Sequence, residues 1–287
     1  MNANWLQSLL CCAMLALVGP HSAATAVEEE VIALVPMPSW EMLEYEQRAF
    51  LVRARSRIEV SPSPESDESW LMTSRSSVAS NSEEVRLEVL AIDGSAEYRS
   101  RLSRGREQRF KTYDFEAEHI DRVRFDPGGE SSLPPDQWPI SSRQEVAYPA
   151  GAEGLAVTDG YALLVIAGQL LESGLDSLSV VVNTEFNFYL VNMSVESENQ
   201  SVDADYRVTN TSSDISGKRT ARVVKLAVSP LGEQPDKHDF SLLGLTGDAT
   251  IFFDKENGLP IQLRGRAPRI GNTQINLKSA TLRSPLA

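Results

Sequence analysis

Apolar and polar side chains alternate along most of the chain, with the period of two that is typical of half-buried β-strands. Residues 83–94 show the pattern most clearly, with one face formed by Val85, Leu87, Val89 and Ala91. Comparable segments occur between residues 50 and 125 and between residues 176 and 283. Together they predict roughly ten or more antiparallel strands.

One segment departs from this alternation and predicts a helix at residues 159–173. Thr158 or Asp159 is the expected N-cap, and Gly174 is the expected residue just past the C-terminus. The apolar side chains cover most of the circumference: Leu163, Leu164, Ile166, Ala167, Leu170 and Leu171. A helix that is apolar nearly all round is buried on several sides, so this one needs a concave sheet to receive it.

Turn and loop signals divide the strands. Asp93-Gly94 and Asn257-Gly258 predict hairpins, because these dipeptides favour tight turns. The stretch 126–154 is rich in Pro and Gly and predicts a long surface loop.

The pattern as a whole predicts a mainly β protein, in which a large curved antiparallel sheet forms a half-open barrel around one central buried helix. We expect three parts: a signal peptide at residues 1–26, a tail at 27–48, and a single β-rich domain at 49–287. The tail is predicted to contain a short helix, with Ser39 as its N-cap.

Residues 1–26 contain no Asp, Glu, Lys or Arg, and they include an apolar run from Leu9 to Gly19. Ala24 and Ala26 provide small residues at the two positions that a signal peptidase reads. We therefore expect cleavage after Ala26 and export to a bacterial periplasm. A buried N-terminal helix and a retained membrane anchor are the alternatives.

Composition narrows the chemistry further. Both cysteines, Cys11 and Cys12, precede the expected cleavage site, so the mature chain is expected to have no disulfide and no thiol chemistry. The net charge of −13 argues against a nucleic-acid binder, which needs clustered positive charge. No later apolar stretch reaches the about 18 residues of a spanning helix, so no transmembrane segment is expected after cleavage.

One hairpin nevertheless concentrates positive charge. Its basic residues are Arg99, Arg101, Arg104, Arg106, Arg109 and Lys111. Arg99 and Arg101 share a strand face, and the return strand is expected to bring Arg109 and Lys111 beside them. Such a cluster suits lipid headgroups or other anionic groups. The alternative is a solvated face whose arginines pair with neighbouring Glu side chains and protect the sheet from aggregation.

The order of these features is similar to that of a known family. The Arg-rich hairpin is followed by a Phe125-Asp126 step, a Pro/Gly loop leads into an Asp-headed apolar helix, and Gly258-Leu259-Pro260 precedes the last strand. In this the chain resembles a bacterial periplasmic family of unknown function, domain-of-unknown-function family thirty-one-hundred-eight. The resemblance implies a half-barrel like those of lipid and lipoprotein carriers, and the family has no established activity to carry over to this chain.

Catalytic signatures do not occur in the sequence. His119 and His238 lie in polar, loop-like segments, and there is no G-x-S-x-G, H-E-x-x-H or P-loop pattern. We therefore expect a protein that is not an enzyme and that uses no cofactor and no metal.

The favoured hypothesis is a non-enzymatic periplasmic protein that binds an apolar or amphipathic envelope ligand in the half-barrel. The candidate contacts are Arg99, Arg101, Arg106 and Arg109 for an anionic group, and Leu163, Ile166 and Leu170 for an apolar one. One alternative is a pocketless envelope module that docks a partner protein through the Arg-rich hairpin. Another is a carboxylate-based glycan-active enzyme. A lipid or an envelope protein is the expected partner.

Overall fold

The computed structural model describes residues 37–284, apart from residues 50–51, 106–107, 130–131 and 233–237. Contacts divide the chain into residues 1–31 and 32–287, and the described residues all belong to the second unit. The expected signal peptide, with its cleavage site, and Arg106 lie outside the described residues.

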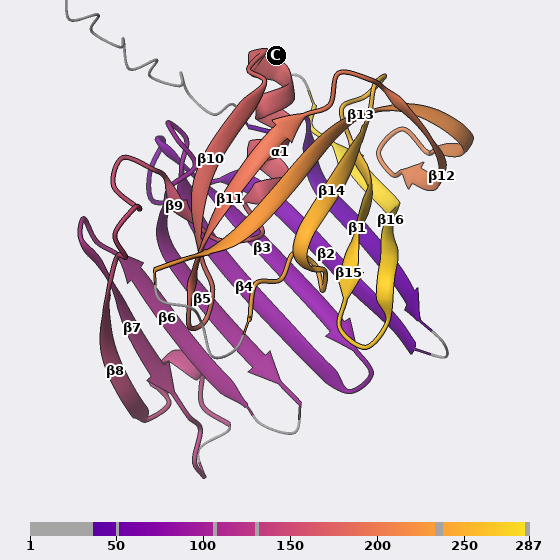
Figure 1. The fold of residues 1–287 in the computed structure, drawn as a ribbon. Helices are drawn as coiled ribbons and strands as arrows, with labels where there is room; N and C mark the ends of the chain where they lie inside the picture. The colour runs from indigo at the N-terminus through magenta and orange to yellow at the C-terminus, as the bar shows by residue number, and fades with distance from the viewer. Residues whose placement is uncertain (1–36, 50–51, 106–107, 130–131, 233–237, 285–287) are drawn as a thin grey trace, which may run out of the picture. The chain divides into compact units, whose positions relative to one another are not determined.

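The described part of the chain is built mainly from strands (Figure 1). In chain order the elements are β1 (Trp40–Ala49), β2 (Val52–Pro62), β3 (Ser69–Val78), β4 (Asn81–Leu90), β5 (Ala96–Arg104), β6 (Arg109–Phe115), β7 (His119–Phe125), the short 3₁₀ turn η1 (Pro135–Gln137), β8 (Ile140–Ala147), β9 (Val157–Thr158), α1 (Leu163–Ser173), β10 (Ser177–Asn183), β11 (Phe188–Val195), β12 (Gln200–Val208), β13 (Ser213–Leu231), β14 (Thr246–Asp254), β15 (Pro260–Ala267) and β16 (Gly271–Leu282). Adjacent strands joined by short turns give most of this order.

All of these strands belong to one sheet, in the order β8-β7-β6-β5-β4-β3-β2-β1-β16-β15-β14-β13-β11-β10-β9. β12 lies off this path and pairs with β13 and β16. Every pair is antiparallel except β9 with β10 and β12 with β16. The predicted mainly β architecture with a large curved sheet is confirmed, with two short parallel pairs added.

The sheet folds back on itself, so that β10, β11, β13 and β14 lie across the face of β3–β5 (Figure 1). One hydrophobic core joins these layers, with contributions from Leu87 of β4, Val182 of β10 and Ile251 of β14. A second, smaller cluster joins β6 and β7 to β9–β11 through residues that include Tyr113, Ile120 and Val181. The strands at the two ends of the sheet order are thus drawn together by side-chain packing, which gives a half-open barrel.

Helix α1 is buried as its composition requires. Seven of its side chains are buried: Leu163, Leu164, Val165, Ile166, Ala167, Leu170 and Leu171. It ends at Gly174, whose φ of 79° is in the left-handed region where a side chain would add strain. The central buried helix is therefore confirmed.

The start of this helix differs from the prediction. Its first residue is Leu163, and the N-cap position is Ala162, which makes no side-chain capping hydrogen bond. Thr158 belongs to β9, and the Asp159 carboxylate accepts a hydrogen bond of 2.9 Å from the Tyr161 N–H in a turn before the helix. The predicted N-cap is wrong because Asp159 is engaged in this turn and by a distant arginine.

Two predicted segments take a different structure. The short helix expected at 27–48 is wrong where the chain is described, because Trp40–Ala49 forms β1 between β2 and β16. The predicted loop 126–154 contains η1 and β8. Strand β8 is an edge strand whose residues are almost all exposed, so it lacks the apolar alternation that identifies a strand from sequence.

Candidate functional site

The concave face of β5–β7 carries charged side chains, although it faces the interior of the half-barrel. The register places Arg101 of β5 opposite Lys111 of β6, and Tyr113 of β6 opposite Arg122 of β7. Residues directly opposite each other share a face, so the strand pairing itself gathers these cations. Arg99 joins them because it lies two residues before Arg101 on β5.

Arg99 is the most deeply buried of these cations, with a side chain 3% exposed. Its guanidinium donates to the Asp159 carboxylate at 2.7 Å and to the backbone carbonyl and side-chain oxygen of Asn183, each at 2.8 Å. It also donates to the Thr184 carbonyl at 3.1 Å and stacks 3.8 Å from the centre of the Tyr113 ring. Arg99 therefore ties β5 to the turn before α1 and to the end of β10.

Glu185 lies among three cations, Lys111, Arg101 and Arg122. We call these four residues the Glu185 cluster. Lys111 donates a hydrogen bond to the Glu185 carboxylate. Nitrogens of Arg101 and Arg122 approach the same carboxylate at 3.6 Å and 3.5 Å. Arg101 has a further partner in Glu83, at 2.6 Å. The turn between β10 and β11 thus inserts one carboxylate among three cations from three strands.

The electrostatics of this cluster shift the ionisation of its members. Burial lowers the pKa of the Lys111 ammonium, and the neighbouring charges of Arg122 and Arg101 lower it further. The hydrogen bond to Glu185 and its negative charge act in the opposite direction, but they do not cancel this effect. Burial alone would raise the pKa of Glu185, but the hydrogen bond from Lys111 and the charges of Lys111, Arg101 and Arg122 bring it below its ordinary value. Glu185 is therefore held as a carboxylate.

This lowered pKa predicts a pH dependence of stability. Because Glu185 titrates lower in the folded than in the unfolded state, its contribution is present above the unfolded pKa of about 4.3 and is lost as pH falls towards the folded pKa. We expect the free energy of unfolding of Glu185→Gln to decline less steeply below about pH 4.5 than that of the wild type. Urea unfolding at a series of pH values measures this, and parallel curves for the two proteins would contradict it.

Two cavities flank the Glu185 cluster. One, of about 200 Å³, is lined by residues that include Glu83, Arg101 and Asp159. The other, of about 110 Å³, is lined by residues that include Tyr113, Arg122 and Gln144. Glu185 lines both cavities, together with Asn183 and Phe186.

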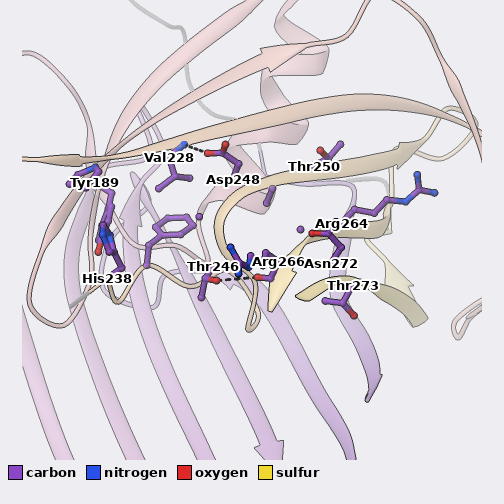
Figure 2. A pocket seen from close by; sticks show the side chains of 15 residues that line it. Tyr189, Val228, His238, Thr246, Asp248, Thr250, Arg264, Arg266, Asn272 and Thr273 are labelled. Carbon is purple, nitrogen blue, oxygen red and sulfur yellow. Dashed lines mark hydrogen bonds between the residues drawn. The ribbon is translucent and has the colours of Figure 1, made fainter. Parts of the chain in front are cut away.

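A larger groove, of about 870 Å³, lies between β13 on one side and β14–β16 on the other (Figure 2). Its apolar lining includes Tyr189, Val228, Pro230, Phe240 and Ala249. Its polar lining includes the charged side chains of Arg264, Arg266 and Asp248 and the imidazole of His238. Arg264 stacks 4.3 Å from the centre of the Phe252 ring, while Arg264 and Arg266 are both exposed. The groove therefore combines an apolar floor with mainly basic charge.

The groove forms because β13 extends beyond the segment that pairs with β14. The β13–β14 ladder begins at the pair Leu226 and Ala249, while β13 continues to Leu231 beside β11. Beyond the ladder, the Val228 N–H donates to the Asp248 carboxylate at 2.8 Å (Figure 2). Two residues further on, Pro230 has no N–H to offer. These features protect the unpaired edge of β13 from pairing with another strand, so that the groove is not closed by an additional strand.

A single extended segment separates the groove from the Glu185 cluster. His238 and Phe240 line the groove, and Asp239 and Ser241 line the cavity of about 200 Å³. Asp239 accepts hydrogen bonds from the Phe186 N–H at 3.0 Å and from the Asn187 side chain at 2.6 Å, as well as from Tyr189. Asp239 thus holds the turn that carries Glu185.

The predicted site residues fall into two groups in the structure. Arg99 and Arg101 lie in the interior clusters, and Arg109 begins β6 opposite Ser103. The apolar candidates Leu163, Ile166 and Leu170 are 0%, 1% and 2% exposed and belong to the main core. Sequence reasoning missed Glu185 and the groove.

A further group of side chains has the composition of a metal site. His119, Asp121 and Glu145 place ligand atoms within 4.8 Å of one another on β7 and β8. His119 is therefore on a strand, although a loop was expected. Asp121 and Glu145 are exposed, and exposed acidic side chains gather in this way without binding a metal.

The fold defines a β-barrel-like protein. It is similar to the crystal structure of a β-barrel-like protein of the domain of unknown function DUF1849 from Brucella abortus, with a TM-score of 0.50 and 10% sequence identity over 88% of this chain and 100% of that chain. No protein-family model and no curated protein matches the chain. The similarity shows the fold alone, and membership of family thirty-one-hundred-eight stays a prediction.

Within residues 37–284, as far as they are described, α1 is too short to cross a bilayer, and no other helix is long and apolar enough.

Proposed function

We propose that this is a non-enzymatic protein of the bacterial periplasm that binds an amphipathic envelope ligand carrying an acidic group. The groove of about 870 Å³ supports this proposal. Its volume is within the range of about 300–1,000 Å³ that is typical of small-molecule sites. The place of binding differs from the sequence hypothesis, which assigned the apolar contacts to helix α1.

The chemistry of the lining indicates the class of ligand. Val228, Pro230 and Phe240 offer apolar surface to an acyl chain or ring system. Arg266 and Arg264 add positive charge to this lining, which favours a ligand that carries an acidic group. The export that the proposal requires is supported by the pattern of residues 1–26.

The groove predicts a specific response to mutation. We expect native mass spectrometry of the protein purified from a bacterial periplasm to show a retained lipid-sized mass, or uptake of an added lysophospholipid with an acidic headgroup. Arg266→Glu should weaken this uptake by about tenfold or more, because it replaces an attraction with a repulsion. Val228→Trp should abolish it by filling the groove.

The matched control is Lys255→Glu, the same charge reversal at an exposed residue in the turn between β14 and β15, away from the groove lining. It should bind the acidic lysophospholipid as the wild type does. The proposal would be contradicted by equal binding of the lysophospholipid to the wild type and Arg266→Glu. It would also be contradicted by a wild type that takes up no amphiphile at all.

A further inference from the structure

We propose that Lys111, Arg101 and Arg122 form a binding site for a phosphate or carboxylate group, which the β10–β11 turn fills with its own carboxylate, Glu185. A ligand bearing such a group displaces Glu185 and moves the turn aside. This site is separate from the groove, and the inference does not rest on the groove binding a ligand.

The convergence of the three cations is the first observation. They come from β5, β6 and β7, and all three approach the single carboxylate of Glu185. Lys111 is 4% exposed, so its ammonium is held within the protein and not in bulk water. Proteins commonly bind phosphate and carboxylate groups by placing ammonium and guanidinium groups around the oxyanion.

The balance of charge is the second observation. Including Arg99, the interior clusters hold four cations, and four carboxylates lie beside them: Glu83, Asp159, Glu185 and Asp239, which lines the larger cavity. Displacement of Glu185 therefore leaves one positive charge among the cations without a counter-charge. A bound phosphate or carboxylate supplies that counter-charge.

Space and unused polar atoms are the third observation. The cavities of about 200 Å³ and 110 Å³ that Glu185 lines are each larger than one water molecule needs. Tyr113 lines the smaller cavity and is 2% exposed, and its hydroxyl has no hydrogen-bond partner among the described residues. Buried hydroxyls are normally paired, so this one indicates a partner that the protein does not itself supply.

The turn that carries Glu185 is suited to move. It is closed by the Thr184 N–H, which donates to the Asn187 carbonyl at 2.9 Å, and Phe186 at its tip is 60% exposed. The Thr184 hydroxyl also donates to the Asn187 carbonyl at 3.0 Å and accepts from the Asn187 N–H at 3.1 Å, so these bonds close the turn on itself. Hydrogen bonds from Phe186 and Asn187 to Asp239 and the contact of Arg122 with the Phe186 ring, at 5.6 Å, attach the turn to the rest of the protein. Residues 185–187 can therefore swing outwards while Arg99 keeps its bonds to Asn183 and Thr184.

The test compares phosphate binding by the wild type, Glu185→Ala and Asp239→Ala. Isothermal titration calorimetry with inorganic phosphate, at an ionic strength held constant with chloride, measures the dissociation constant. We expect Glu185→Ala to bind at least tenfold more tightly than the wild type, because the internal competitor is gone. Asp239→Ala keeps all three cations and Glu185 but loosens the turn, and it should bind with intermediate affinity.

A second background locates the bound anion. Adding Lys111→Met to Glu185→Ala should return phosphate binding to the wild-type level or below. The control Glu196→Ala removes a carboxylate that pairs with the single cation Lys225 among the described residues, at 2.6 Å, and should create no phosphate site. A parallel titration with short-chain phosphatidic acid distinguishes the source: tighter binding of the lipid than of phosphate indicates a headgroup, and equal binding indicates the free anion.

The inference fails if Glu185→Ala and Asp239→Ala both bind phosphate no more tightly than the wild type. If Glu185→Ala does not fold, Asp239→Ala and the phosphate dependence of the wild-type urea midpoint decide the question. A midpoint that is unchanged by phosphate, together with unchanged affinity in Asp239→Ala, would make Glu185 a structural counter-ion only.

Discussion

Replacing Arg99 with leucine is expected to lower the free energy of unfolding by about 3–5 kcal/mol, the range measured when one partner of a buried ion pair is removed. The substitution leaves the Asp159 carboxylate, which is 13% exposed, without its cation. It also leaves the carbonyls of Asn183 and Thr184 without the donor they now share. For a domain of this size the loss corresponds to a fall in Tm of about 6–20 °C, which differential scanning calorimetry would measure.

An exposed arginine provides the matched control. Arg57 forms ion pairs with Glu44 and Glu59, but its side chain is 47% exposed. Arg57→Leu should change the stability by no more than about 1 kcal/mol, because exposed pairs are screened by water. Similar losses for Arg57→Leu and Arg99→Leu would contradict the structural role given to Arg99.

A double-mutant cycle separates the ion pair from the other contacts. Asp159→Ala and Arg99→Leu should be less damaging together than the sum of the two single changes, because each single variant leaves a charged group unpaired. Strict additivity would show that the two side chains do not act as a pair.

The same arginine shows what the sequence can and cannot predict. The alternation along β5 correctly indicates that Arg99 and Arg101 share a face. It does not indicate that this face is the interior one, because charged residues are expected outside. That outcome depends on Asp159 and Asn183, which are 60 and 84 residues away along the chain. No local pattern contains this information.

The secondary-structure elements also divide into those that the sequence predicts and those that it does not. The central helix and the β4–β5 hairpin could be predicted, since they depend on local periodicity and on the turn at Gly94, with its φ of 80°. The edge strand β8 could not, because exposure on both faces removes the apolar alternation. The groove could not be predicted from the sequence, because it arises where β13 separates from β14. The one sequence signal we identify is Pro230, which lies on β13 next to that opening.

Asp254 is the residue for which we expect the second large effect. It lies at the end of β14 with a side chain that is 0% exposed, and it forms an ion pair with Arg219 at 2.8 Å. The two guanidinium bonds go to its two oxygens, and the Tyr206 hydroxyl donates a third at 2.9 Å. Burial, reinforced by this carboxylate, raises the pKa of Tyr206 to about 12, so the hydroxyl remains a donor at ordinary pH.

Asp254→Ala is therefore expected to cost about 1.5–3 kcal/mol, because the buried Tyr206 hydroxyl of β12 loses its acceptor and the Arg219 guanidinium of β13 keeps only Glu256 among the described residues. Urea unfolding monitored by circular dichroism measures the loss. The control is Asp205→Ala, which removes a carboxylate that is 82% exposed and pairs with Lys278 at 2.9 Å. It should cost less than about 1 kcal/mol. A small loss for Asp254→Ala would mean that hydrophobic packing alone positions β12, β13 and the β14–β15 turn, and that the buried carboxylate is dispensable.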